Sequence, residues 1–139
     1  MLQAQRHWQW QISSEQNRLV LDMGEMQFCT PYKPRQLTDE ALSEPQFNLL
    51  DADFYKQVGE YLSTFNLWSD AQICQIALNA TAVKHYLKPV LAKSWFFAPY
   101  TGRDINQEAI VSLTSQCQSG QFLIVDCADG ASVCLCLEP

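Results

Sequence analysis

The sequence predicts an α+β fold, in which strands and helices follow one another in separate runs along the chain. Two observations indicate this class. Short segments that alternate between apolar and polar residues occupy both ends of the chain, and between them lie two longer segments with apolar residues at the helical spacing. With 139 residues, the chain is long enough for one domain or for two very small ones.

An N-terminal strand meander is expected first. Its three strands are predicted at residues 7–12, 18–23 and 26–29. The first strand alternates so that Trp8, Trp10 and Ile12 lie on one face. Aromatic residues at this spacing could also stack on nucleic-acid bases, but the half-buried face of a sheet is the better explanation.

A helical hairpin is expected to cover this meander. Thr38 can cap a short helical turn ahead of it. The first long helix is predicted to have Asp51 or Asp53 as its N-cap, and the second is opened by a capping box at Ser69. Pro89 ends the second helix. The apolar stripes of the two helices are Phe54, Val58, Tyr61, Leu62 and Phe65, and Ile73, Ile76, Ala77, Ala80, Val83 and Leu87.

After Pro89 the pattern returns to strands. They are predicted at residues 94–98, 109–114, 121–126 and 133–137. An Asp129-Gly130 pair between the last two is a strong signal for a hairpin turn. We therefore expect an N-terminal α/β domain at residues 1–89 and a small β-rich C-terminal domain at residues 90–139.

Charge and composition exclude several functions. Nine basic and fifteen acidic residues give a net charge of -6, and a negative chain repels phosphate backbones and anionic lipids. Neither nucleic-acid binding nor membrane insertion is expected. The N-terminal residues lack the apolar core of a signal peptide, and no apolar run is long enough for a membrane helix. A cytoplasmic protein is the expectation.

No motif for catalysis, metal or cofactor is present. The six cysteines contain no C-x-x-C pair, and the only histidines are His7 and His85, so we expect buried, reduced thiols and no zinc. We interpret His85 as a surface or helix-capping residue. The acidic pairs at predicted helix starts, Asp39-Glu40 and Asp51-Asp53, are interpreted as partners of the helix dipoles. An enzyme is not expected, and no cofactor is predicted.

One stretch of the chain is positively charged. No acidic residue lies between Asp70 and Asp104, so this stretch sums to +4 while the rest of the chain sums to -10. Its cations are Lys84, Lys88, Lys93 and Arg103. With the aromatic residues and proline around them, they form a candidate docking surface for an acidic protein partner. The alternative is that lysines gather near a helix C-terminus because the dipole favours them there.

Two stretches resemble the ZapC family, Z-ring-associated cell-division proteins of gammaproteobacteria. They are Leu-Asn-Ala at residues 78–80 and Leu-Lys-Pro-x-x-x-Lys-Ser-Trp at residues 87–95, followed by Phe97. Agreement runs from Trp8 to Phe97, weakens, and resumes in the last two predicted strands. The family's Trp- and Pro-containing segment is replaced here by residues 100–104, and the family chain runs on for a few dozen residues after 139. This chain is therefore expected to lack any binding determinant in that tail.

The resemblance implies a cytoplasmic protein recruited to the midcell division ring. It implies binding to FtsZ, lateral bundling of FtsZ protofilaments, dampened FtsZ GTPase activity and a surface pocket in each of two domains. Lys88 and Lys93 match family positions implicated in FtsZ contact. Leu21 matches a functionally sensitive position, which we interpret as structural because apolar neighbours surround it.

The predicted site follows from these matches and from the charged stretch. Its FtsZ-binding residues are Lys84, Lys88, Pro89, Lys93 and Arg103, and its structural or pocket residues are Trp8, Trp10, Leu21 and Trp95. The alternative function is a small α+β domain that binds a small molecule in an apolar pocket. The sequence leaves the oligomeric state open between a monomer and a weak dimer.

Overall fold

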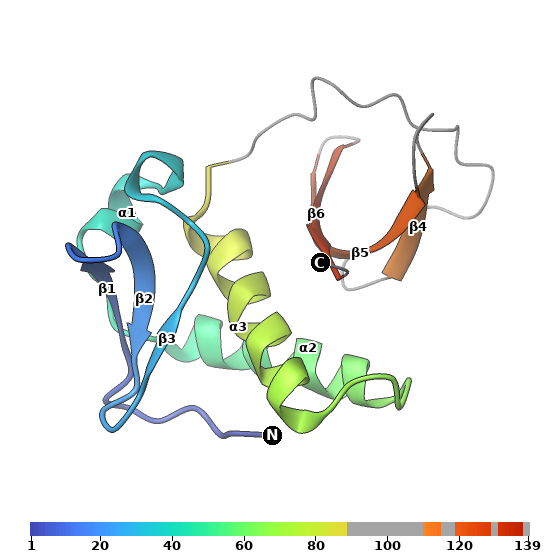
Figure 1. Ribbon diagram of the computed structural model, residues 1–139, viewed down its shortest axis with the longest axis horizontal. Coiled ribbons are helices and arrows are strands. Elements are labelled where there is room, and N and C mark those ends of the chain that lie inside the picture. The colour runs from blue at the N-terminus through green and yellow to red at the C-terminus, as the bar shows by residue number, and fades with distance from the viewer. Residues whose placement is uncertain (89–109, 115–118, 129–130, 138–139) are drawn as a thin grey trace. The chain divides into compact units, whose positions relative to one another are not determined.

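A computed structural model of the protein describes residues 1–88, 110–114, 119–128 and 131–137. The chain divides into two compact units, Met1–Lys88 and Pro89–Pro139. The first unit contains β1 (Gln9–Ser13), β2 (Arg18–Asp22), β3 (Gln27–Cys29), η1 (Pro34–Gln36), α1 (Asp39–Leu42), α2 (Leu49–Ser63) and α3 (Asp70–Tyr86) (Figure 1). The second contains β4 (Ile110–Thr114), β5 (Ser119–Ala128) and β6 (Ala131–Cys136). The predicted α+β class is confirmed.

The N-terminal sheet is an antiparallel meander with the strand order β1-β2-β3. Its register pairs Trp10 with Leu21 and Leu21 with Phe28. Three consecutive residues of the central strand, Leu19, Val20 and Leu21, are all buried. Because successive side chains of a strand point to opposite faces, β2 is covered on both faces and not on one alone.

The first strand begins two residues later than predicted, because His7 lies in a turn. In that turn the backbone N–H of Trp8 donates to the carbonyl of Gln5 at 3.2 Å. Trp8 is nevertheless buried, just ahead of β1. The alternation therefore predicted which face of the segment is buried, although the strand itself starts at Gln9.

Each helix of the first unit starts at a polar N-cap. Thr38 and Ser69 cap α1 and α3 as predicted. The N-cap of α2 is Asn48, so the assignment to Asp51 or Asp53 was wrong: Asp51 is the third helical residue and closes a capping box with Asn48. The helices α2 and α3 are joined by a short connection and pack against each other as the predicted hairpin (Figure 1).

An aromatic cluster joins the meander to the helices. The ring of Trp8 lies 5.4 Å from that of Phe47 and 6.1 Å from that of Tyr55, both edge-on. The ring of Trp10 lies 5.6 Å from that of Tyr86, also edge-on. Aromatic pairs prefer this edge-to-face arrangement. Both tryptophans are buried, so their faces are not available for stacking on bases.

The second unit contains an antiparallel sheet of order β4-β5-β6. Its long central strand buries Leu123, Ile124 and Val125, with an irregular register between Ile124 and Asp126. The strands β5 and β6 pair as far as Ala128 and Ala131. The predicted turn between them and the predicted strand at residues 94–98 lie outside the described residues.

Candidate functional site

Two of the predicted FtsZ-contact residues lie at the C-terminal end of α3. The side chain of Lys88 is exposed, while its backbone N–H donates to the carbonyl of Gln36 at 2.8 Å. The ammonium of Lys84 lies 4.8 Å from the centroid of the Phe54 ring on α2, within the range of a cation–π contact. The side chain of Lys84 and the backbone of Lys88 are thus each held by a neighbouring element.

The other predicted site residues lie either in the core or outside the residues that the structure describes. Trp8, Trp10 and Leu21 are buried, which places them in the packing of the sheet and not on the surface. Pro89, Lys93, Trp95 and Arg103 lie outside the described residues. The structure therefore brings Lys84 and Lys88 to one end of α3 and leaves their grouping with the remaining cations a prediction.

A buried carboxylate, Asp51, lies beneath this end of α3. Its Oδ2 accepts hydrogen bonds from Trp10 Nε1 at 3.2 Å, from the Tyr86 hydroxyl at 2.8 Å and from the Asn48 backbone N–H at 3.2 Å. Its Oδ1 lies 2.7 Å from Nδ1 of His85. Four donors fill the acceptor positions of the carboxylate, so this group fastens β1, α2 and α3 together.

The interpretation of His85 as a surface or capping residue was therefore wrong. Its side chain is only 22% exposed and pairs with Asp51. The antiparallel hairpin places the last turn of α3 beside the first turn of α2, and this contact spans 34 residues of sequence. The interpretation of Asp51 as a dipole partner was incomplete for the same reason.

The buried tyrosines give a prediction for alkaline pH. Burial raises the pKa of Tyr32 to about 12, and the pKa values of Tyr55 and Tyr86 are also raised, first by burial and then by Cys74 and Asp51 respectively. An unfolded chain ionises its tyrosines near pH 10. Between pH 10 and the raised pKa the folded chain therefore holds more protons, and the free energy of unfolding falls as the pH rises.

We expect each such tyrosine to remove up to about 1.4 kcal/mol per pH unit above pH 10. Urea unfolding at pH 8, 10 and 11, with tyrosinate absorbance of the native protein, measures this loss. Tyr32→Phe should flatten the pH dependence by its own share. Native titration of every tyrosine near pH 10 would contradict the prediction.

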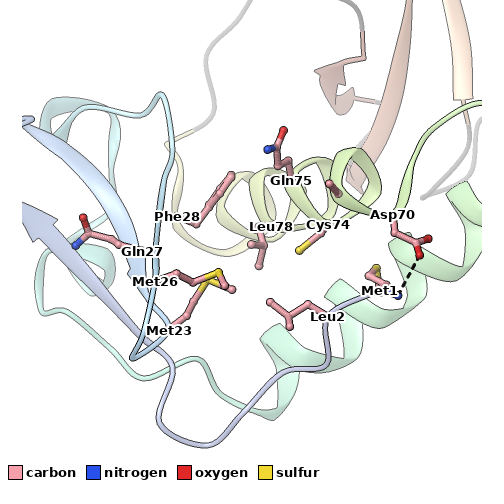
Figure 2. Close-up of a pocket in the computed structure, with 11 residues that line it drawn as sticks. Met1, Leu2, Met23, Met26, Gln27, Phe28, Asp70, Cys74, Gln75 and Leu78 are labelled. Carbon is pink, nitrogen blue, oxygen red and sulfur yellow. Dashed lines mark ion pairs between the residues drawn. The ribbon is translucent and has the colours of Figure 1, made fainter.

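An apolar groove opens at the other end of α3 (Figure 2). Its volume is about 470 Å³. All three methionines of the chain line it. An apolar pocket was expected, but Trp8, Trp10 and Leu21, which were named for it, do not line this groove, because its walls come from segments that are distant in sequence. The lining residues are Met1 and Leu2; Met23, Met26, Gln27 and Phe28; and Asp70, Ala71, Cys74, Gln75 and Leu78.

This groove can accept an apolar segment of a partner. Methionine side chains are flexible and polarisable, so a surface rich in them adapts to the shape of what it binds. Met26 is 58% exposed, and Met1 and Leu2 are about two-fifths exposed. Part of the apolar surface of the groove is therefore accessible to solvent.

The cysteines differ from the expectation of buried thiols. Cys29 and Cys136 are exposed, and Cys74 is half-buried with its Sγ 3.3 Å from the Tyr55 hydroxyl. Cys29 is exposed because it ends an outer strand of the described sheet. Among the residues that the structure describes, no three His, Cys, Asp or Glu side chains are grouped closely enough to hold a metal ion.

Across residues 1–88 and the described strands of the second unit, no helix has both the length and the apolar character that crossing a membrane requires.

The two units match two known families of sequence. Residues 1–88 match the family described as "Cell-division protein ZapC, N-terminal", and residues 89–139 match "Cell-division protein ZapC, C-terminal". The resemblance found in residues 78–80 and 87–95 is thereby confirmed.

Individual relatives match over nearly all of the chain. The "Cell division protein ZapC" of Pseudoalteromonas translucida is 59% identical over 139 residues, which are 99% of this chain and 79% of the relative. Those of Aeromonas hydrophila and Aliivibrio salmonicida are 34% and 33% identical, over 96% and 99% of this chain and 76% and 78% of the relatives. The chain therefore belongs to the ZapC family of cell-division proteins.

Proposed function

We propose that the chain is a non-enzymatic, cytoplasmic accessory protein of the midcell division ring. It binds FtsZ, holds FtsZ protofilaments side by side and dampens their GTPase activity. The observation that carries this proposal is the match of both units to the ZapC family. The exposed cation at the end of α3 and the apolar groove supply two surfaces through which it could act.

The first contact is proposed at the cationic end of α3. The Phe54 ring holds the Lys84 ammonium and the Gln36 carbonyl holds the backbone of Lys88, so binding would order little beyond the exposed Lys88 side chain. Opposite charges on FtsZ would speed encounter and fix the orientation of the complex. We propose that Pro89, Lys93 and Arg103 extend this surface along the chain.

The second contact is proposed in the groove. Cys74 in the groove and Lys88 are 14 positions apart along α3 and its exit, which corresponds to about 20 Å at the helical rise. We propose that these two surfaces contact different FtsZ subunits. Two contacts on one particle allow it to link filaments without forming a dimer, because valence raises avidity.

Sedimentation with FtsZ and GTP tests the proposal. We expect the chain to pellet with FtsZ polymers, to thicken the bundles seen by electron microscopy and to slow phosphate release. Binding should weaken with added salt, because exposed charges are screened. If the chain does not pellet with FtsZ polymers and the bundles do not thicken when it is added, the proposal fails.

A second candidate function is the binding of a small apolar molecule. The groove volume of about 470 Å³ lies in the range of small-molecule pockets, and this observation favours the candidate. Such a ligand would displace a hydrophobic dye from the groove and raise the melting temperature.

A further inference from the structure

The last turn of α3 is attached to the rest of the first unit through side chains and through the backbone. Nδ1 of His85 donates to Oδ1 of Asp51 at 2.7 Å, and the Tyr86 hydroxyl donates to Oδ2 at 2.8 Å. The backbone carbonyl of Tyr86 accepts from the N–H of Thr38 at 2.8 Å. Asp51 is fully buried in the first turn of α2. A movement of this end of α3 would therefore leave a buried charge with fewer donors, which is costly.

The two described cations of this end of α3 flank the attached residues. Lys84 directly precedes His85, and Lys88 lies two positions after Tyr86. The backbone N–H of Lys88 donates to the carbonyl of Gln36 at 2.8 Å. The direction in which Lys88 leaves the helix is therefore set by the same segment that binds the carbonyl of Tyr86.

A phenylalanine ring joins His85 to Lys84. The imidazole of His85 lies 6.0 Å from the Phe54 ring, centroid to centroid, and the Lys84 ammonium lies 4.8 Å from the centroid of the same ring. A cation at this distance from an aromatic ring is attracted to it. Asp51 thus holds the imidazole, the imidazole packs on the ring, and the ring holds the ammonium.

We propose that His85 and Tyr86 are positioning residues for FtsZ binding, and that their hydrogen bonds to Asp51 hold Lys84 and Lys88 in the arrangement that an acidic surface of FtsZ recognises. This inference rests on the proposed function. Tyr86 is buried and His85 is only 22% exposed, so both act through the lysines. A binding surface is more precise when the residues behind it are locked by packing and hydrogen bonds, and a surface ordered in advance loses less entropy on binding.

Three substitutions test the hydrogen bonds of the helix end. His85→Asn keeps an N–H donor at the position of Nδ1 and removes the ring, whereas His85→Phe keeps a ring and removes the donor. Tyr86→Phe removes the second donor and keeps the ring that packs on Trp10. Thr30→Val is the matched control, because it removes a buried hydrogen bond, to the Leu19 carbonyl at 2.6 Å, in the sheet and not at the end of α3.

The attachment of the helix end is measured without FtsZ, by amide hydrogen exchange. The N–H of Lys88, which donates to a carbonyl of η1, is compared with that of Ile73, which is bonded at the other end of α3. Relative to this reference, exchange at Lys88 should be several-fold faster in His85→Phe and Tyr86→Phe, because local opening becomes easier. It should be nearly unchanged in His85→Asn and Thr30→Val.

FtsZ co-pelleting of the same variants is then measured at low and at high salt, with folding verified by circular dichroism. His85→Phe and Tyr86→Phe should weaken binding about 3- to 10-fold at low salt. Their difference from the wild type should shrink at high salt, because the groups that they position are charges. A residue that only stabilised the fold would not change this salt dependence. His85→Asn and Thr30→Val should bind nearly as well as the wild-type chain.

The outcomes are distinguishable. If the wild-type chain co-pellets with FtsZ and both phenylalanine variants bind equally well, the inference is wrong while the proposed function stands. If the wild-type chain does not co-pellet, both fall. Equal weakening in Thr30→Val would trace the effect to general stability, and equal weakening in His85→Asn would show that the hydrogen bond is not what positions the lysines. Either result overturns the inference, as does unchanged exchange at Lys88. If one phenylalanine variant does not fold, the other decides.

Discussion

Replacement of Asp51 by alanine is expected to lower the free energy of unfolding by about 3–5 kcal/mol, the usual cost of removing one partner of a buried charged network. The carboxylate is fully buried and accepts from Trp10, Tyr86 and the Asn48 backbone while pairing with His85. Without it, donors from three separate parts of the first unit lose their acceptor inside the protein. Urea unfolding at pH 7, followed by tryptophan fluorescence, measures the change.

Asp53→Ala is the matched control for this substitution. It removes the same charge from the same helix, two residues away, at an exposed position, and should cost within about 0.5 kcal/mol. Asp51→Asn should fall between the two, because the amide keeps one acceptor oxygen but turns its NH2 group toward neighbouring donors. Equal stability of Asp51→Ala and Asp53→Ala would show that the carboxylate does not hold the elements together.

Local patterns in the sequence predicted most elements of the first unit. Apolar alternation placed Trp8 and Trp10 in the core, and the capping box at Ser69 set the start of α3. These features depend on residues within a turn or two of one another, so sequence alone contains them. The start of α2 was misplaced because Asn and Asp are both preferred at the N-cap position. The choice between Asn48 and Asp51 depends on tertiary contacts of the helix that the local sequence does not contain.

Contacts between distant segments could not be predicted in this way. The Asp51–His85 pair joins two helix ends that are 34 residues apart, and nothing in either local pattern refers to the other. The groove likewise combines the chain start, the segment before and within β3, and the first half of α3. The three methionines of the chain were the one indication in the sequence, because methionine is common at binding surfaces.

The grouping of the cations is another feature that the sequence alone could not settle. Sequence reasoning grouped Lys84, Lys88, Lys93 and Arg103 because no acidic residue interrupts them. The structure shows how the first two are held, by a ring of α2 and by a carbonyl of η1. Substitution of these residues, followed by a binding measurement, tests whether the four cations act together.

Reversal of two of these charges, Lys88→Asp with Lys93→Asp, is expected to weaken FtsZ binding about 10- to 100-fold, as for contacts at the centre of an interface. The change takes the local charge of the stretch from +4 to zero and removes two hydrogen-bond donors. Attraction to an acidic FtsZ surface is thereby lost, and the wild-type dependence of binding on salt should lessen with it. Co-pelleting with FtsZ across a salt series measures both effects.

Lys33→Asp with Lys56→Asp is the matched control, because it produces the same change of net charge, from -6 to -10, at two exposed positions outside the charged stretch between Asp70 and Asp104. It should leave co-pelleting nearly unchanged, which separates a local contact from general repulsion between two acidic proteins. Lys88 is exposed, so its reversal should alter the free energy of unfolding by no more than about 0.5 kcal/mol. If both double variants weaken FtsZ binding equally, the loss of binding is caused by net charge and not by a local contact. Unchanged binding of the Lys88 and Lys93 variant would instead place the FtsZ contact in the groove, and a large fall in melting temperature would make these lysines structural.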